Sequence, residues 1–374
     1  MKIQVTKEDL SKAVAACLPS TDARGTMPVL ACVLLKATGK LVGVDSTDLE
    51  THYSGSCPGM VKAPGVVVVN ARTLEKLIKT LPKKSVITLS ANGDKNLTVE
   101  CGATWKIPGT NPDEVPPVPL SEVAVGVDMA AATLLDLINK TLFSAYTGDL
   151  EYHIAGVHWE NIAGRLRAAA TDGHRLTIMD GPEYAPLLPF DEKGFIGSSV
   201  AMRAMAIFLK GQETVNVLLA DRLLILTAQN GHRLFIRTPA GVKSFPDCRR
   251  IIPKAKHIKN VVMVPRHEMI DAISRITAPS KDHFKGIVLT FRGDTLTLTL
   301  SDPELGEAQA TVKAPRIKGE GNFMIGFNAR YLAEPLSRMT GEFVELAGTD
   351  PDRPWQIICE ADPGYLTVIM PMCL

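Results

Sequence analysis

The chain contains no run of about 18 apolar residues, the length that a membrane-spanning helix needs. Its first residues, MKIQVTKEDL, include no apolar signal core, so we expect a protein that stays in the cytoplasm and does not bind membranes. The 7 cysteines include no C-x-x-C pair and are odd in number. This pattern favours reduced thiols over a disulfide framework.

Motifs for nucleotides and metals are also missing. The sequence has neither G-x-x-x-x-G-K-[ST] nor H-E-x-x-H. His153 and His158 lie in a strand-like stretch at a spacing that points them to opposite faces, so we expect no metal and no cofactor. Aromatic residues make up only 5% of the chain, which disfavours a stacking platform for single-stranded nucleic acid. The net charge of +1 does not by itself indicate a partner.

One pattern occurs three times along the chain: a strand, a polar turn that contains Asp, and a return strand. It reads LVGVDSTDLETHYSG, then LRAAATDGHRLTIMDG, then LTLTLSDPELGEAQAT. The turns hold Asp48, Asp172 and Asp302, which are spaced by roughly 124 and 130 residues. Such a long period indicates repeated domains rather than a short solenoid repeat.

Two helices are predicted in each repeat. The first opens the repeat, in TKEDLSKAVAAC, DMAAATLLDLINKTLFSA and PRHEMIDAISRITA. The second follows a residue suited to an N-cap, which is Asn70 in the first repeat, Ser198 or Ser199 in the second and Asn328 in the third. Short alternating strands fill the remainder, and Asn92-Gly93 and Asn230-Gly231 are turn signals.

Pro-rich stretches mark the predicted boundaries between the repeats. NPDEVPPVPLSE ends the first and KSFPDCRRIIPKAK ends the second. The chain is therefore predicted to be α+β, with domains at residues 1–122, 123–254 and 255–374, each with two helices packed on antiparallel sheets.

Four motifs give the chain a specific resemblance: ATDGHRL, FPDCRRIIP, IGFNARYL and the ending VIMPMCL. In order and spacing they resemble the bacterial DNA polymerase III beta subunit, the sliding clamp, over essentially the whole chain. The resemblance implies the DNA clamp fold and a head-to-tail homodimer that forms a ring around double-stranded DNA. It also implies a non-catalytic processivity factor that a clamp loader places on DNA and that tethers the replicative polymerase and repair proteins through short peptide motifs.

Edge strands at opposite ends of the chain are the candidates for closing such a ring. The expected strands are NLTVECGATWKI in the first domain and TLTLTLSD in the third. Lys95 and Lys106 on the first side face Glu304 and Glu307 on the second, which is a faint charge contrast. Strand pairing and apolar contacts are therefore expected to contribute most of the closure.

Lysines and arginines recur on the predicted helices of all three repeats. On a ring of helices they would form a basic surface that meets phosphates without reading bases. The resemblance adds Arg24 as a DNA contact. The predicted DNA-binding residues are Arg24, Arg72, Lys76, Lys79, Lys140, Arg203 and Arg275. Gly148 and Ser198-Ser199 replace side chains that often contact DNA in the family, so we expect a lighter contact through the second domain.

The resemblance also implies a client pocket that binds short peptides. Matched motif by motif, it consists of Ile154, Thr171, Gly173, His174, Arg175, Leu176, Pro246, Arg250, Ile251, Val368, Met370, Pro371 and Met372. The residue types suit this role, because methionines repack easily around different partners and the basic residues offer a polar rim. Cys373 stands where the family often has a basic residue.

ATDGHRL allows a competing hypothesis, a hydrolase that uses Asp172 and His174. In a tight turn, however, Asp accepts backbone N–H groups and Gly173 provides a permissive backbone. The other two repeats have Asp in matching turns without His. We therefore expect an architectural Asp and no catalytic residues.

Overall fold

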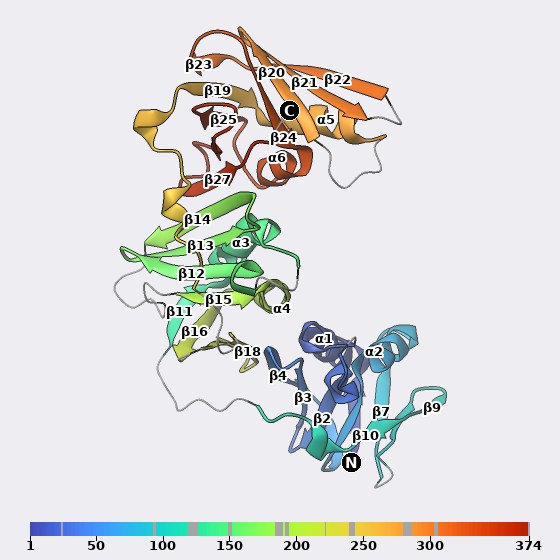
Figure 1. Ribbon diagram of the computed structural model, residues 1–374. Helices are drawn as coiled ribbons and strands as arrows, with labels where there is room; N and C mark the ends of the chain where they lie inside the picture. Colours follow the sequence, from blue (N-terminus) through green and yellow to red (C-terminus); the bar gives the residue numbers. More distant parts are fainter. Residues whose placement is uncertain are drawn as a thin grey trace. The chain divides into compact units, whose positions relative to one another are not determined.

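The computed structural model describes residues 1–23, 25–92, 95–118, 126–148, 152–183, 190, 194–220, 222–238, 244–279, 286–302 and 306–372 (Figure 1). It divides into two compact units. The first consists of Met1–Leu135 and Val200–Val242, and the second of Asp136–Ser199 and Lys243–Leu374. Within the described residues, no helix is long and apolar enough to cross a membrane.

The first unit contains two antiparallel sheets. One has five strands in the order β5 (Met60–Ala63), β1 (Lys2–Thr6), β7 (Val86–Ser90), β8 (Leu97–Glu100) and β9 (Thr104–Ile107). The other has nine strands in the order β10 (Gly109–Thr110), β6 (Gly65–Asn70), β2 (Cys32–Thr38), β3 (Leu41–Thr47), β4 (Thr51–Pro58), β18 (Arg233–Arg237), β17 (Leu223–Ala228), β16 (Thr214–Ala220) and β11 (Val127–Ala130). Because β4 pairs with β18, this sheet continues from the first predicted repeat into the second.

Helix α1 (Lys7–Cys17) shows why these segments are helical. Leu10, Val14 and Cys17 are buried at helical spacing and form one apolar stripe. The hydroxyl of Thr6 caps the first turn by accepting the Asp9 N–H at 3.1 Å. Asn70 caps helix α2 (Ala71–Thr80) in the same way, as the sequence predicted.

The second unit also contains two sheets. Its nine-stranded sheet has the order β15 (Phe195–Ser198), β12 (Gly156–Ile162), β13 (Arg165–Thr171), β14 (Arg175–Glu183), β27 (Tyr365–Ile369), β26 (Trp355–Ile358), β25 (Phe343–Gly348), β19 (Asn260–Pro265) and β23 (Arg316–Lys318). Its four-stranded sheet has the order β22 (Gly306–Lys313), β21 (Thr295–Asp302), β20 (Gly286–Arg292) and β24 (Phe323–Asn328). Here β14 of the second repeat pairs with β27 of the third.

The predicted pair of helices is present in every repeat. After α1 and α2 come α3 (Ala131–Thr141) and α4 (Ser199–Leu209), and then α5 (Arg266–Thr277) and α6 (Ala329–Leu336). Asn328 caps α6 by accepting the Arg330 N–H at 2.9 Å, as predicted. The Asn230-Gly231 turn joins β17 to β18, whereas Gly93 lies outside the described residues. The predicted boundaries near residues 122 and 254 remain a prediction.

One expectation about edge strands was wrong. TLTLTLSD forms β21, which lies between β20 and β22 and buries Leu296, Leu298 and Leu300. The chain returns through Gly306–Lys313 and covers the edge of β21, so β22 is the terminal strand on that side of the sheet. In the first repeat, NLTVECGATWKI forms β8 and β9, and only β9 is an edge.

Candidate functional site

The ATDGHRL segment forms a tight turn between β13 and β14. One oxygen of Asp172, Oδ1, accepts the N–H groups of His174 and Arg175, each at 3.0 Å. The hydroxyl of Thr171 accepts the Gly173 N–H at 3.1 Å, and Gly173 has a φ of +89°, a conformation that glycine adopts without strain. Asp172 Oδ1 is therefore occupied by hydrogen bonds from the backbone of its own turn.

The turn of the first repeat has the same construction. Asp48 Oδ1 accepts the Glu50 N–H at 3.1 Å, and Leu49 takes the place of Gly173 with a φ of +76°. The second oxygen of Asp172, Oδ2, accepts a hydrogen bond from Arg175 Nε at 3.0 Å. With both oxygens engaged, the Asp172 carboxylate has an architectural role, as predicted. Among the described residues, no group of three or more His, Cys, Asp and Glu side chains could hold a metal ion.

The strand pair beside this turn carries a buried apolar cluster. Leu176 on β14 pairs with Val368 on β27, and both side chains are buried in a small cluster with Ala169 and Ile178. Phe245, Cys248, Ile252 and Leu366 pack against this cluster. Burial raises the pKa of the Cys248 thiol to about 12, so Cys248 is a neutral, apolar part of the packing.

Exposed apolar side chains follow directly from these strands. Met370, Met372 and Ile251 are large hydrophobic residues with 38–42% of their surface exposed. The Met370 N–H donates to the His174 carbonyl at 2.9 Å, and the Met372 N–H donates to the Gly326 carbonyl at 2.8 Å. The C-terminal segment therefore leaves β27 alongside the ATDGHRL turn. We use the name groove for the set Leu176, Val368, Ile251, Met370 and Met372, in which Leu176 and Val368 are buried and the other three are exposed.

Most of the remaining predicted pocket residues lie near the groove. The carbonyls of Ile154 and Thr171 both accept the Tyr146 N–H, at 3.0 and 3.1 Å, which places these two residues together. Cys248 donates to the Pro246 carbonyl, and Arg250 extends into solvent with 85% of its side chain exposed. Gly173 and His174 are exposed in the turn, and Pro371 is half-buried beside Met370.

Arg175 departs from the expected polar rim, because only 2% of its side chain is exposed. Its guanidinium donates to Glu334 on α6 and to the carbonyl of Phe143, and it lies over the rings of Tyr331 and Phe143 at 4.4 and 5.3 Å. Burial and the nearby Asp172 carboxylate raise the pKa of the Tyr331 hydroxyl. Sequence reasoning missed Phe143, Tyr331 and Glu334, since only the fold brings them to Arg175.

The predicted DNA-binding residues other than Lys140 fall into three groups. Arg72, Lys76, Arg203 and Arg275 are exposed on helices α2, α4 and α5. Lys79 is exposed on α2 and forms an ion pair with Glu75 at 2.6 Å. Arg24 lies outside the described residues.

Lys140 differs from the expected free cation. Its side chain is only 10% exposed, and its ammonium forms ion pairs with Asp362 at 2.9 Å and with Asp136 at 3.3 Å. Asp362 also accepts the Thr340 N–H at 2.6 Å. The DNA contact of Lys140 remains a prediction, but this geometry does not favour it because the charge is already neutralised inside the protein.

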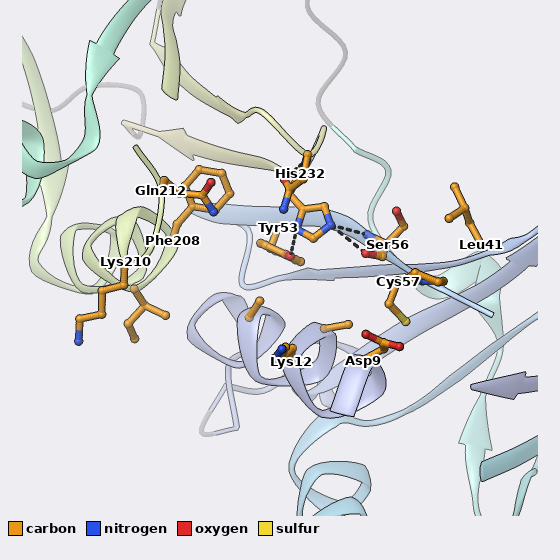
Figure 2. A pocket seen from close by; sticks show the side chains of 15 residues that line it. Asp9, Lys12, Leu41, Tyr53, Ser56, Cys57, Phe208, Lys210, Gln212 and His232 are labelled. Atoms are coloured by element: carbon orange, nitrogen blue, oxygen red, sulfur yellow. Dashed lines mark hydrogen bonds between the residues drawn. The ribbon is translucent and has the colours of Figure 1, made fainter. Parts of the chain in front are cut away.

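The first unit contains a cavity of about 600 Å³ beside its nine-stranded sheet, on the face that α1 covers (Figure 2). Asp9 and Lys12 come from α1, and Phe208 and Lys210 come from the end of α4 and the turn after it. His232 Nδ1 and the Tyr53 hydroxyl are hydrogen-bonded at 3.0 Å, and His232 Nε2 lies 2.8 Å from the Ser56 carbonyl oxygen. This network joins β4 to the turn before β18.

An internal comparison helps to explain the cavity. Ala16 also lines it and is the tenth residue of α1, while Lys140 is the tenth residue of α3. Where the second and third repeats meet, the Lys140 side chain extends to Asp362. At the same position in its helix, Ala16 has only a methyl group.

Comparisons with known proteins agree with this structure over the full length. The chain matches the family models for the N-terminal domain of the DNA polymerase III beta subunit at residues 1–119 and for its C-terminal domain at residues 249–373. It is 27% identical to the beta sliding clamp of Caulobacter vibrioides and 29% identical to that of Pseudomonas aeruginosa, in each case covering 100% of both chains.

Solved structures give the same result. The beta sliding clamp of C. crescentus superposes with a TM-score of 0.92 at 25% identity, covering 100% of this chain and 99% of the other. The DNA polymerase III beta subunit of P. aeruginosa gives 0.88 at 26% identity, covering 100% of both. The fold and its repeats place the chain in the class of DNA clamps, which are non-catalytic accessory proteins. Within that class, the chain belongs to the family of the bacterial DNA polymerase III beta subunit, the beta sliding clamps.

Proposed function

We propose that this protein is a sliding clamp that keeps a replicative DNA polymerase on its template by topology rather than by tight binding. The observation that carries the proposal is the full-length structural match to beta sliding clamps, together with the family matches at both ends of the chain. The competing hydrolase hypothesis loses its support, because the Asp172 carboxylate is engaged by the turn and by Arg175 and the family is non-catalytic. A cytoplasmic location at the bacterial nucleoid is part of this proposal.

The homodimeric ring is the structural part of the proposal. A chain with different ends joins head to tail, and two such contacts can close a ring. The terminal strands β9 and β22 are the candidates for these contacts, since an edge strand presents unpaired backbone groups. The exposed face of β22 carries Glu307, and the exposed face of β9 carries Lys106. Opposite charges on the two edges favour joining β9 to β22 over joining two copies of either.

Duplex DNA is the proposed partner of the exposed helical cations. Arg72 and Lys76 are one turn apart on α2 and therefore share a face. Contacts of this kind neutralise phosphates without reading base edges, so binding would be independent of sequence and sensitive to salt. An ATP-driven clamp loader would open the ring, because a closed ring cannot pass onto circular DNA unaided.

The groove is the proposed docking site for client peptides of polymerases, the clamp loader and repair proteins. Its base is apolar, its exposed methionines can adapt to several ligands, and Arg250 and His174 provide polar groups at the rim. A peptide with a Gln and a Leu-Phe end would bury two large side chains, each of which contributes about 1.5–3 kcal/mol. We expect a Kd of about 1 µM after the cost of ordering the peptide.

Retention on DNA of different topology tests the central proposal. Protein loaded on nicked circular DNA by a bacterial clamp loader should stay bound during gel filtration at moderate salt. It should be lost when the same DNA is cut once. Equal retention on linear and circular DNA would contradict a topological clamp, and a monomeric mass in sedimentation would contradict the ring.

A further inference from the structure

We propose that Arg175 is a positioning residue of the groove: it fixes the ATDGHRL turn and the α6–β24 element, which we call the two walls of the groove, relative to each other, and its guanidinium does not contact the client peptide. The inference rests on the proposed function of the groove as a peptide site. It assigns to Phe143, Tyr331 and Glu334, which do not line the groove, a role in client binding.

The surroundings of the guanidinium leave it little to offer a ligand. Nε donates to Asp172 at 3.0 Å, one terminal nitrogen donates to Glu334, and the other donates to the Phe143 carbonyl. The rings of Tyr331 and Phe143 lie at 4.4 and 5.3 Å. All three nitrogens thus have an acceptor within the protein, and the group is buried. A peptide would have to displace one of these charge-assisted bonds to reach it, which would cost more than a new bond returns.

The partners of Arg175 belong to both walls of the groove. Asp172 shapes the turn that carries His174, which is the wall from the second repeat. Glu334 and Tyr331 lie on α6, which directly follows β24, and Gly326 of β24 accepts the N–H of Met372. Arg175 therefore connects the turn to the α6–β24 element, which is the other wall.

The first repeat shows that the turn does not need an arginine. Thr51 pairs with Ile236 as Arg175 pairs with Ile369, and the Thr51 hydroxyl donates to Asp48 at 2.9 Å. In that turn the side chain closes back on its own Asp. In the second repeat, Arg175 occupies the same position and also donates to Glu334 on α6. This additional contact therefore holds the turn against α6 and is not needed to close the turn itself.

This comparison provides a test variant, Arg175→Thr, which gives the second turn the closing residue of the first. Binding would be measured by calorimetry with two peptides, one with Gln and a Leu-Phe end and one with Ala in place of Gln. We expect Arg175→Thr to weaken both peptides by the same factor, at least tenfold, so that the ratio of the two affinities is unchanged. Glu334→Gln should weaken both in the same proportion, and the double variant should be no worse than Arg175→Thr alone.

Arg330→Thr is the matched control. Arg330 also forms an ion pair with Glu334, at 3.9 Å, but it is more than half exposed, so its loss should leave both affinities within twofold of the wild type. If Arg175→Thr weakens only the Gln peptide, Arg175 is a peptide contact and the proposal is overturned. Unchanged affinity for both peptides in a folded Arg175→Thr protein overturns it as well.

Hydrogen exchange of the free protein gives a readout that does not depend on peptide binding. The amide of Met370 donates to the ATDGHRL turn and that of Met372 donates to β24, and both should exchange at least tenfold faster in Arg175→Thr and in Glu334→Gln. The amides of β1, in the other unit, serve as the internal reference. If the wild type binds neither peptide, the proposed function of the groove fails, while unchanged exchange at Met370 and Met372 overturns the role of Arg175 itself.

Discussion

Replacing Lys140 by Met should destabilise the second unit considerably, because it leaves Asp362 buried without its countercharge. Removing one partner of a buried ion pair costs about 3–5 kcal/mol. We expect the lower end, about 3 kcal/mol, because Asp362 keeps the hydrogen bond from the Thr340 N–H. For a unit of about 200 residues, the size of the second unit, that loss corresponds to a fall of about 6–12 °C in its Tm.

Differential scanning calorimetry would measure the effect, with Lys79→Met as the matched control. Lys79 also pairs with an acidic residue, but 65% of its side chain is exposed, so its loss should cost no more than about 0.5 kcal/mol. The double variant Lys140→Met/Asp362→Asn should recover at least half of the loss, since no buried charge remains unpaired and Asp136, the other partner of Lys140, is half exposed. A fall in Tm no larger than that of Lys79→Met would refute this reasoning.

The same ion pair has a defined pH window. Burial alone would raise the pKa of Asp362, but the hydrogen bonds from Thr340 and Lys140 outweigh it and lower the pKa below its usual value. A lowered pKa gives stability that is present above the unfolded value, near pH 4, and is lost as the pH falls through the folded pKa. Burial alone would lower the pKa of Lys140, but its hydrogen bond to Asp362 raises the pKa overall. A raised pKa gives stability that is present at neutral pH and is lost only when strong alkali deprotonates the amine.

Three further outcomes are expected. Replacing Arg72 and Lys76 by Ala should each reduce the slope of log K against log salt for duplex binding by about 1, measured by anisotropy, with no change in base preference; an unchanged slope would exclude them as phosphate contacts. Gln309 and Ala310 are adjacent on β22, so replacing one of them by Pro removes an N–H that points outward from the sheet. At least one of Gln309→Pro and Ala310→Pro should therefore be monomeric in sedimentation while its circular dichroism spectrum stays native. Leu176→Asp places an unpaired charge at a buried position of the groove, so it should abolish peptide binding in calorimetry while the dimer persists. If this variant binds the peptide with wild-type affinity, the client site lies elsewhere.

Local signals in the sequence predicted the helices well. Asn70 and Asn328 were identified as N-caps because a capping side chain acts on residues two or three positions ahead. The repeat of the Asp turn was equally visible, since Asp48 and Asp172 bind backbone within their own turns. Such features depend on a few neighbouring residues, which the sequence displays directly.

Features that depend on distant partners could not be predicted in this way. A lysine late in an amphipathic helix indicates a solvated cation, and nothing near Lys140 in the sequence announces Asp362, 222 residues away. The alternation in TLTLTLSD correctly indicates a strand with one buried face, but alternation does not say which strands flank it. Arg175 combines both problems, since its turn is local while Glu334 is 159 residues away.

The first junction between repeats is the pairing of β4 with β18, and the second is the pairing of β14 with β27. The two junctions share one backbone arrangement but carry different side chains. In both, the strand after the Asp turn pairs with a strand of the next repeat, and the last N–H of that pairing returns to the turn: Arg237 donates to Glu50 in the first junction, and Met370 donates to His174 in the second. The register places His52 where the second junction has Leu176.

The side chains at these matching positions differ in kind. His52 packs edge-on against Phe235 with ring centroids 5.9 Å apart, and Arg237 follows, whereas Leu176 packs with Val368 and Met370 follows. A buried imidazole and a cation suit a polar contact, while an aliphatic pair with a flexible thioether suits the apolar end of a peptide. Client binding at the second junction, as proposed, would therefore depend on a few side chains placed on a shared backbone, with Arg175 holding that backbone in place.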